Sequence, residues 1–418
     1  MTKLGLCLSG GGSKGAYEIG VYRALRRIKK NPEIVTGTSV GALNGLLIVQ
    51  GDLYKSVKLW KNISFRQIYD ENSFKDCDDL SIAEIYKNYA KSFIKEGGMD
   101  IKGLLNIFDE YYDSKKFFTS PIDYGLVTYN LTKHKPVMMT KKDLTPETVK
   151  DYVIASASCF PAFKPYKIKG DNYIDGGYYD NLPINLAVEM GADEIIAVDL
   201  RAVGFKRTAP EGVPLVVITP KNKIGSFLVF DKTKAKEAMH FGYNDTMKMY
   251  GKLDGDKFTF KKRNLVRNYN KYAKQYDQHF HSIFDNANGK IINKLTNLPL
   301  FKEYLDNLLS YKKFNQIVEK AGFYLDFPED IIYNIKTYNK GLFNELLKAN
   351  PIDIKIITKK IKNKNFTKIL DKKQIVRFFY DTIVNNNIKE AYTYIPFFID
   401  EFMVALYILI TKGRKKSY

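Results

Sequence analysis

One serine in the sequence lies in a pattern that holds nucleophiles: Ser39, in the pentapeptide Gly37-Thr38-Ser39-Val40-Gly41. A short apolar segment precedes the pentapeptide, and an apolar segment typical of a helix follows it. A serine on a tight strand-to-helix turn needs small flanking residues, because the backbone is strained and neighbouring chain comes close. Amide groups at the start of the helix favour negative charge that develops beside the serine. The pattern therefore predicts a nucleophilic serine.

A glycine run, Gly10–Gly15 (GGGSKG), follows another short apolar segment near the start of the chain. Consecutive glycines expose backbone N–H groups in a concave nest that can hold an oxyanion, and Lys14 adds positive charge. The run also fits the dinucleotide pattern G-x-G-x-x-G, but that site needs an acidic residue closing the second strand. Here the second strand ends in the Ser39 turn, and P-loop spacing is absent. We therefore predict an oxyanion site and not a nucleotide site.

The third motif is Asp175-Gly176-Gly177, at the end of a predicted strand. A carboxylate held by a glycine turn could accept the proton of the Ser39 hydroxyl directly. Asp-Gly is also a common turn dipeptide, so this motif alone does not indicate a catalytic residue. It does so only together with the other two motifs. His240 follows both motifs in the order of an ordinary triad. It lies in a helical stretch typical of a surface or core-edge histidine, and Ser39 follows only one or two strands, so a Ser-Asp dyad fits better.

Alternating strands and helices are predicted around these motifs. The first four elements are a strand at 4–9, a helix at 16–30, a strand at 34–35 and a helix at 42–49. Strands are also expected at 124–129, 136–140 and 168–174, a helix opening at Thr145-Pro146 and another at 186–190, and buried strands at 194–200 and 213–219. Strand–helix alternation is the pattern of a mainly parallel sheet covered by helices. The sequence therefore predicts an α/β fold.

In this order the three motifs resemble the patatin-like phospholipase family, and the resemblance covers roughly residues 3 to 250. Further similar segments are Ala155–Ser158, Asn181–Pro183 and Gly191–Asp193. The resemblance implies a three-layer α/β/α core with a mainly parallel sheet. It also implies a serine acyl-hydrolase that cleaves lipid esters through an acyl-enzyme, without a metal or a cofactor. The expected substrate is a lipid or phospholipid.

Roles for individual residues also follow from this resemblance. Ser39 is expected to be the nucleophile and Asp175 the base, and the expected oxyanion hole consists of Gly10, Gly11 and Gly12. The residues expected to support the motifs are Lys14, Gly15, Gly37, Gly41, Gly176 and Gly177. Lys14 stands where the family usually has arginine, which keeps the charge but loses the planar guanidinium fork.

Positive charge is concentrated in the last part of the chain. The net charge is +20, and residues 251–418 carry 31 Lys and Arg against 17 Asp and Glu. In this region the composition changes, and Lys, Asn and Tyr dominate. Residues 317–321 and 331–335 show the periodicity of a helix, and few segments have the pattern of a strand. We predict a catalytic domain at 1–254 and a basic, mostly helical domain at 255–418. Such a region either contacts an anionic partner or is a solvated face; we expect peripheral contact with anionic membrane and no nucleic acid.

The segment 395–410 is apolar apart from Asp400 and Glu401. It is shorter than the ~20 apolar residues of a membrane span, so a packed helix, an interfacial helix and an anchor are all considered. Three scattered cysteines and four histidines form no ligand spacing, so we expect no metal site. We expect a cytoplasmic protein, because no signal peptide is recognisable.

Two alternatives to a hydrolase remain at this stage. An acyltransferase would share the same acyl-enzyme, so the sequence does not separate the two. The other alternative is a non-catalytic module that binds membrane or nucleic acid on the same scaffold.

Overall fold

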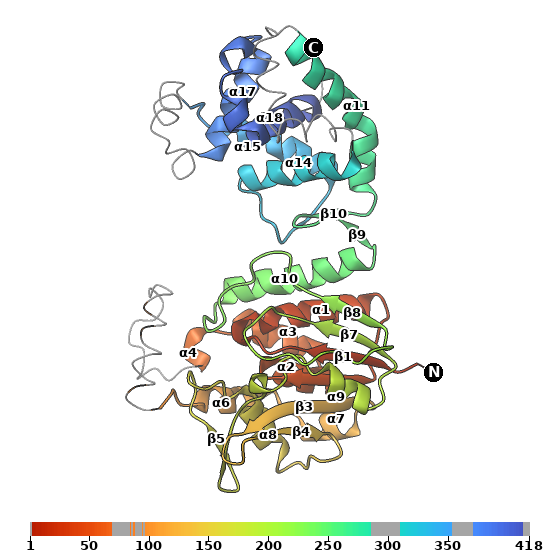
Figure 1. Cartoon of the computed structure of the whole chain (residues 1–418), viewed down its shortest axis with the longest axis vertical. Coiled ribbons are helices and arrows are strands. Elements are labelled where there is room, and N and C mark those ends of the chain that lie inside the picture. The colour runs from red at the N-terminus through yellow and green to blue at the C-terminus, as the bar shows by residue number, and fades with distance from the viewer. Residues whose placement is uncertain are drawn as a thin grey trace. The chain divides into compact units, whose positions relative to one another are not determined.

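The computed structural model describes residues 2–68, 84, 87, 94, 97–285, 310–352 and 371–412. The chain divides into two compact units, Met1–Met249 and Tyr250–Tyr418 (Figure 1). This division lies slightly before the boundary predicted at 254/255. The reason is strand β9 (Leu253–Asp254), which pairs with β10 (Thr259–Lys261) of the second unit.

The first unit is built on an eight-stranded mixed sheet, with strand order β5-β6-β3-β2-β1-β7-β8 and β4 paired to β3. Neighbours from β3 to β8 in this order run parallel, whereas β4, β5 and β6 are antiparallel additions at the β3 end. The strands are β1 (Leu4–Leu8), β2 (Ile34–Thr38), β3 (Asp123–Asn130), β4 (Lys135–Thr140), β5 (Tyr166–Ile168), β6 (Asp171–Asp175), β7 (Glu194–Val198) and β8 (Leu215–Ile218).

Helices cover both faces of this sheet, which confirms the predicted three-layer α/β/α class. Helix α2 packs over Val35 and Tyr124 on one face, and α9 packs over Gly5 and Gly125 on the other. In Figure 1, α1 and α10 lie together on the α2 side. The helices are η1 (Gly12–Gly15), α1 (Ala16–Arg27), α2 (Val40–Val49), α3 (Leu53–Asn62), α4 (Phe65–Ile68), α6 (Lys102–Tyr111), α7 (Ser114–Thr119), α8 (Val149–Ala157), η4 (Gly176–Tyr178), α9 (Ile184–Glu189) and α10 (Lys232–Met249).

Three local predictions in this unit are wrong. The strand expected at 168–174 is a hairpin of β5 and β6, because the chain turns at Lys169 and Gly170, both at positive φ. Helix α8 begins at Val149, after a turn in which the N–H of Thr145 donates to the Thr148 hydroxyl. Strand β8 was expected to be buried, but it lies at the edge of the sheet and its first three residues are exposed.

The second unit is mostly helical, as predicted, and α18 lies at its centre. Nearly every side chain of α18 is buried, and it contacts α11, α14, α15 and α17. The segment at 395–410 is therefore largely a packed helix. The helices are α11 (Asn264–Asp285), α14 (Tyr311–Tyr324), α15 (Ile335–Lys348), α17 (Lys372–Val384), η5 (Ile388–Glu390), η6 (Ile395–Phe397) and α18 (Ile399–Thr411).

A small sheet of order β11-β10-β9 accompanies these helices. Strand β11 (Ile332–Tyr333) lies within the stretch 331–335, where helix was predicted, and α15 begins only at Ile335. The bridging partner of β11 is β10, some seventy residues earlier in the chain, and such a distant pairing leaves no periodic signal in the local sequence. No helix among the described residues has the length and hydropathy needed to cross a bilayer.

Candidate active site

Strand pairing brings Ser39 and Asp175 to the same place. Strand β4 pairs with one edge of β3 over the range Gly125–Asn130. Strands β2 and β6 therefore both pair with the opposite edge of β3, one after the other. The last residue of β2, Thr38, is opposite Val127, and the last residue of β6, Asp175, is opposite Thr128. Since these partners are consecutive on β3, the two strand ends meet. Residues 136 positions apart in sequence thus become neighbours.

The Ser39 turn has the strained geometry expected of a nucleophile elbow. Ser39 has φ 57° and ψ −126°, a left-handed conformation that non-glycine residues rarely adopt. A side chain at Gly37 would collide with the backbone of Gly41, and one at Gly41 would collide with the Leu8 carbonyl. The N–H of Ser39 donates to the Ser156 hydroxyl at 3.0 Å. Close packing on both sides therefore holds the serine in its strained conformation.

Asp175 is a buried carboxyl that accepts a hydrogen bond from the Ser39 hydroxyl. Burial raises its pKa to about 6, while the hydrogen bonds from Ser39 and from the Gly177 N–H oppose that rise. The Gly177 N–H lies 2.7 Å from Oδ1 of Asp175 and fixes the orientation of the carboxyl. Gly176 packs against the Val127 carbonyl, where a side chain would collide. A carboxylate with a pKa near 6 is ionised at neutral pH and is able to accept a proton.

The glycine loop lies directly against Ser39. A Cβ built on Gly10 would be only 3.2 Å from the Cβ of Ser39. The N–H of Gly10 donates to the Asn181 carbonyl at 3.0 Å, so this amide is engaged and not available to an oxyanion. Across the described part of the chain, no acceptor faces the N–H groups of Gly11 and Gly12. Of the three glycines predicted to form an oxyanion hole, only Gly11 and Gly12 therefore keep backbone N–H groups without a partner in the described part of the chain.

The other predicted motif residues surround this centre. Lys14 lines a cavity at the site; burial lowers the pKa of its ammonium group, and Asp199 opposes that effect. Gly15 packs against α2, where its Cβ would lie 2.5 Å from a methyl group of Val40. His240 is exposed on α10 and lines neither of the cavities at Ser39.

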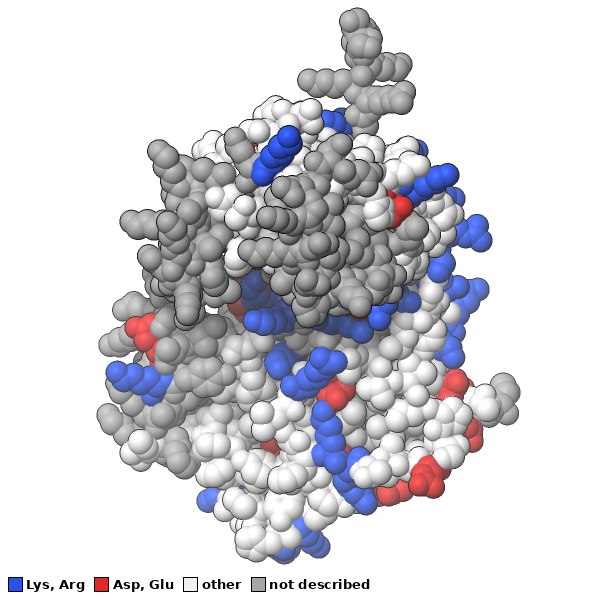
Figure 2. Space-filling model, turned by 45° about the horizontal axis from the view of Figure 1, so that its top comes forward, with Lys and Arg blue, Asp and Glu red and all other residues white. Residues whose placement is uncertain are grey.

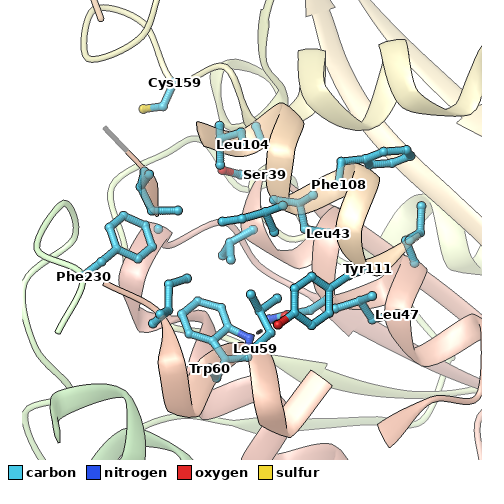
Figure 3. Close-up of a pocket in the computed structure, with 18 of the residues that line it drawn as sticks. Ser39, Leu43, Leu47, Leu59, Trp60, Leu104, Phe108, Tyr111, Cys159 and Phe230 are labelled. Atoms are coloured by element: carbon cyan, nitrogen blue, oxygen red, sulfur yellow. Dashed lines mark hydrogen bonds between the residues drawn. The ribbon is translucent and has the colours of Figure 1, made fainter. Parts of the chain in front are cut away.

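Two cavities of different character meet at Ser39. One is an apolar pocket between α2, α3 and α6, and Figure 3 shows Ser39 at one end of it with Trp60 and Tyr111 at the other. The other is a cavity of about 490 Å³ that also contains Asp175 and whose polar wall includes Lys14 and Arg201. Both cavities are mainly apolar, and the second one differs in having the cations of Lys14 and Arg201 on its wall.

Several residues of the site were not assigned a role from the sequence. The Ser156 hydroxyl accepts a hydrogen bond from the Ser39 N–H and donates one to the Val127 carbonyl at 2.7 Å. It therefore links the turn at Ser39 to β3. Asn181 donates to and accepts from Gly10 and so holds the glycine loop. Both lie in segments that resemble the family, Ala155–Ser158 and Asn181–Pro183, which was the only available signal. Among the described residues no group of three His, Cys, Asp or Glu side chains could hold a metal ion.

Comparison with known proteins places this site in a family context. A family model described as "Patatin-like phospholipase" matches residues 6–188. Lysophospholipase NTE1 of Chaetomium globosum is 29% identical over 201 residues, which cover 48% of this chain and 12% of that protein. Patatin-like phospholipase domain-containing protein 7 of Rattus norvegicus is 26% identical over 199 residues, which cover 47% and 13%. The match thus spans only about an eighth of these relatives' length.

Solved structures give weaker similarities. VipD from Legionella pneumophila aligns with a TM-score of 0.38 and 14% identity, covering 100% of this chain and 93% of that one. The type III effector protein ExoU aligns with a TM-score of 0.34 and 11% identity, covering 97% and 77%.

Proposed function

Residues 6–188 form a patatin-like phospholipase domain, and on that premise we propose that the chain is a serine acyl-hydrolase of lipid esters, of the phospholipase A or lipase type. The contact between the Ser39 hydroxyl and the buried Asp175 carboxyl supports this proposal most directly. The unengaged N–H groups of Gly11 and Gly12 beside it supply a place for an oxyanion. These three parts are what acyl transfer to a serine requires.

In the acylation step, the Ser39 oxygen attacks the ester carbonyl carbon while its proton passes to the Asp175 carboxylate. The carbonyl oxygen becomes an oxyanion, which accepts hydrogen bonds from the Gly11 and Gly12 N–H groups. When the tetrahedral intermediate collapses, the alcohol leaves with the proton that Asp175 received. The acyl group remains on Ser39 as an ester.

Deacylation repeats these steps with water as the nucleophile. Asp175 takes a proton from the water, the hydroxide oxygen attacks the acyl carbon, and the same amides hold the new oxyanion. Collapse of this intermediate releases the fatty acid, and the proton returns to the Ser39 oxygen. One carboxyl thus acts as base and acid in turn.

For the substrate, we propose a lysophospholipid as the first class to test. Of the two relatives described above, that of Chaetomium globosum is named a lysophospholipase. The apolar pocket is suited to an acyl chain, and Lys14 and Arg201 in the second cavity are suited to a phosphate. We also propose that the basic second unit draws the chain toward anionic membrane, as a peripheral cytoplasmic protein. On the face shown in Figure 2, blue Lys and Arg side chains are more abundant than red Asp and Glu.

Labelling with a fluorophosphonate tests the nucleophile. The wild-type chain should be labelled and should release fatty acid from a lysophospholipid, and Ser39→Ala should do neither. Ser282→Ala, at an exposed serine of α11, is the matched control and should behave as wild type. Full ester hydrolysis by Ser39→Ala would refute the proposal. Adding an alcohol to the assay separates the transferase alternative, which would give acyl ester in place of free fatty acid.

A further inference from the structure

The segment Arg201–Arg207 (RAVGFKR), called here the 201–207 loop, has an apolar tip between basic flanks. Alanine, valine, glycine and phenylalanine occupy the tip, and no acidic residue occurs between Arg201 and Pro210. The loop follows β7 and forms part of the wall of the cavity that contains Ser39 and Asp175. Its composition is that of segments which lie at a membrane interface, where apolar side chains enter lipid and basic side chains remain at the head groups.

Apolar side chains of this loop are exposed at the mouth of the cavity. Val203 is 100% exposed and Phe205 is 69% exposed, and Tyr178, on the wall of the same cavity, is 42% exposed. Single exposed apolar residues are ordinary on a protein surface, but three around one mouth form a patch. The patch frames the opening through which a lipid would reach Ser39.

The exposure of Phe205 does not come from a loose backbone. Its N–H donates to the Gly177 carbonyl at 2.9 Å, and its carbonyl accepts from the Asn181 N–H at 2.5 Å. Beside it, Gly204 has φ +151° and packs so closely on Asn181 that a Cβ would lie 2.8 Å from that side chain. The loop is therefore fixed to the same residues that hold Asp175 and the glycine loop, while the side chains of Val203 and Phe205 stay exposed.

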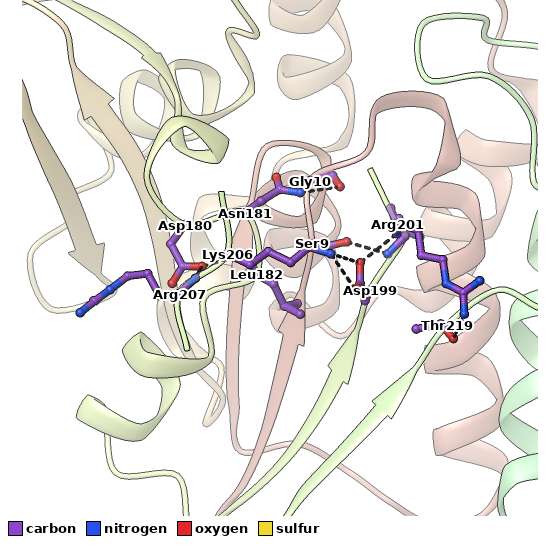
Figure 4. A network of polar contacts seen from close by, with 11 residues as sticks. Ser9, Gly10, Asp180, Asn181, Leu182, Asp199, Arg201, Lys206, Arg207 and Thr219 are labelled. Carbon is purple, nitrogen blue, oxygen red and sulfur yellow. Dashed lines mark hydrogen bonds and ion pairs between the residues drawn. The ribbon is translucent and has the colours of Figure 1, made fainter. Parts of the chain in front are cut away.

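The charges of the loop favour an anionic surface. Figure 4 shows Lys206 paired with Asp199, at 2.7 Å, and Arg201 bonded to the uncharged Thr219 hydroxyl at 3.2 Å. The guanidinium of Arg207 lies over the ring of Tyr179, 5.2 Å from its centre, and its charge acts to lower the pKa of the buried Asp180 carboxyl, against the larger effect of burial. Arg201 and Arg207 are both exposed, and phosphate groups match the guanidinium fork.

We propose that the 201–207 loop is an interfacial anchor for a membrane surface that contains anionic phospholipid. Val203 and Phe205 enter the head-group region, and Arg201 and Arg207 contact lipid phosphates. Bound in this way, the mouth of the cavity faces the lipid, so that substrate reaches Ser39 without crossing water. The inference rests on the proposed lipid substrate, but it concerns binding and not chemistry.

Vesicle sedimentation of the full chain in a Ser39→Ala background tests the anchor without turnover, so its outcome is independent of the labelling experiment. Vesicles consist of phosphatidylcholine, alone or mixed with phosphatidylserine. Replacing both Val203 and Phe205 by serine should weaken binding to mixed vesicles by about tenfold or more. Both side chains are exposed, so the thermal unfolding midpoint should stay that of the parent chain.

The matched control replaces Val266 and Phe323 by serine, since these exposed side chains of the second unit are of the same types. The control should bind vesicles like the parent chain. Equal losses in the two double variants, or an unchanged loop variant, would overturn the anchor. Replacing Arg201 and Arg207 by glutamine should reduce the preference for phosphatidylserine and leave only the part that the basic second unit supplies. An unchanged preference would assign the whole charge effect to the second unit and refute this part of the proposal.

Discussion

The two units of the chain differ in the polar groups that they bury and in the partners of those groups. The first unit buries three carboxyl groups around the site, Glu18, Asp175 and Asp180, and burial is the main cause that raises the pKa of each. In the second unit, Asn268, Asn339 and Tyr407 form a closed ring of hydrogen bonds of 2.7 to 3.0 Å. The buried carboxyl of Glu401 in this unit is paired with the Lys372 ammonium group.

Buried ionisable groups cost stability, and a neutral ring with every bond made stabilises the core. Strained backbone and desolvated charge are typical of functional sites, where geometry and proton affinity matter more than stability. We therefore expect substitutions in the first unit to change activity, with stability unchanged or increased. In the second unit, we expect changes in stability with little change in turnover.

Replacing Asp175 by asparagine should have the largest effect on activity. Asparagine keeps the size and an acceptor oxygen but cannot take the Ser39 proton, so kcat should fall by about 10²- to 10⁴-fold. The same variant should be more stable at pH 7, by about 1–3 kcal/mol, because a buried charge is removed. Product release and urea unfolding measure the two effects. Asp326→Asn, at an exposed aspartate of the second unit, is the control and should change neither.

A pH series should give the next largest effect and should separate activity from stability. Asp175 must be ionised to act as base, so kcat/KM should fall about tenfold per pH unit below about 6. Its folded pKa is raised above the ordinary 3.8, so its contribution to stability is present below pH 3.8 and lost as pH rises through about 6. Activity and this part of the stability thus change in opposite directions. A flat kcat/KM between pH 5 and 7 would contradict the role of Asp175.

Filling the apolar pocket should give a smaller effect, confined to long acyl chains. Leu47 lies on α2 and lines the pocket near Tyr111, away from Ser39 (Figure 3). With Leu47→Trp, turnover of a long-chain ester should fall about tenfold relative to a short-chain ester, because the larger side chain occupies the place of the distal methylenes. Leu347→Trp, at an exposed leucine of α15, is the control. An equal loss on both esters would show that the pocket does not hold the acyl chain.

Local motifs allowed much of the site to be predicted. The small residues at Gly37 and Gly41 are required by contacts within a few residues of Ser39, so the sequence shows them directly. The strand–helix alternation likewise indicated the sheet and its cover. Such features depend on short stretches of chain, and a single sequence is enough to recognise them.

The rest depends on contacts between distant segments. The engaged Gly10 amide follows from Asn181, 171 residues away, and the hairpin that ends at Asp175 is set by pairing with Thr128. The apolar pocket combines side chains from α2, α3 and α6, none of which forms a motif alone. In the second unit, aromatic residues occur on each of the described helices α11, α14, α15, α17 and α18, so the sequence predicts helices but not the central place of α18.

Tyr407→Phe should have no effect on activity. It tests directly whether a substitution in the second unit changes stability without changing turnover. Removing this hydroxyl breaks the bonds to Asn268 and Asn339 and leaves two buried amide groups with unmet hydrogen bonds. The second unit should lose about 1–3 kcal/mol of unfolding free energy, while kcat and KM of the folded chain stay at wild-type values. Urea unfolding together with ester turnover below the transition measures both. A fall in kcat equal to that of a pocket variant would mean that the second unit takes part in the chemistry, because loss of stability alone does not alter turnover by the molecules that remain folded.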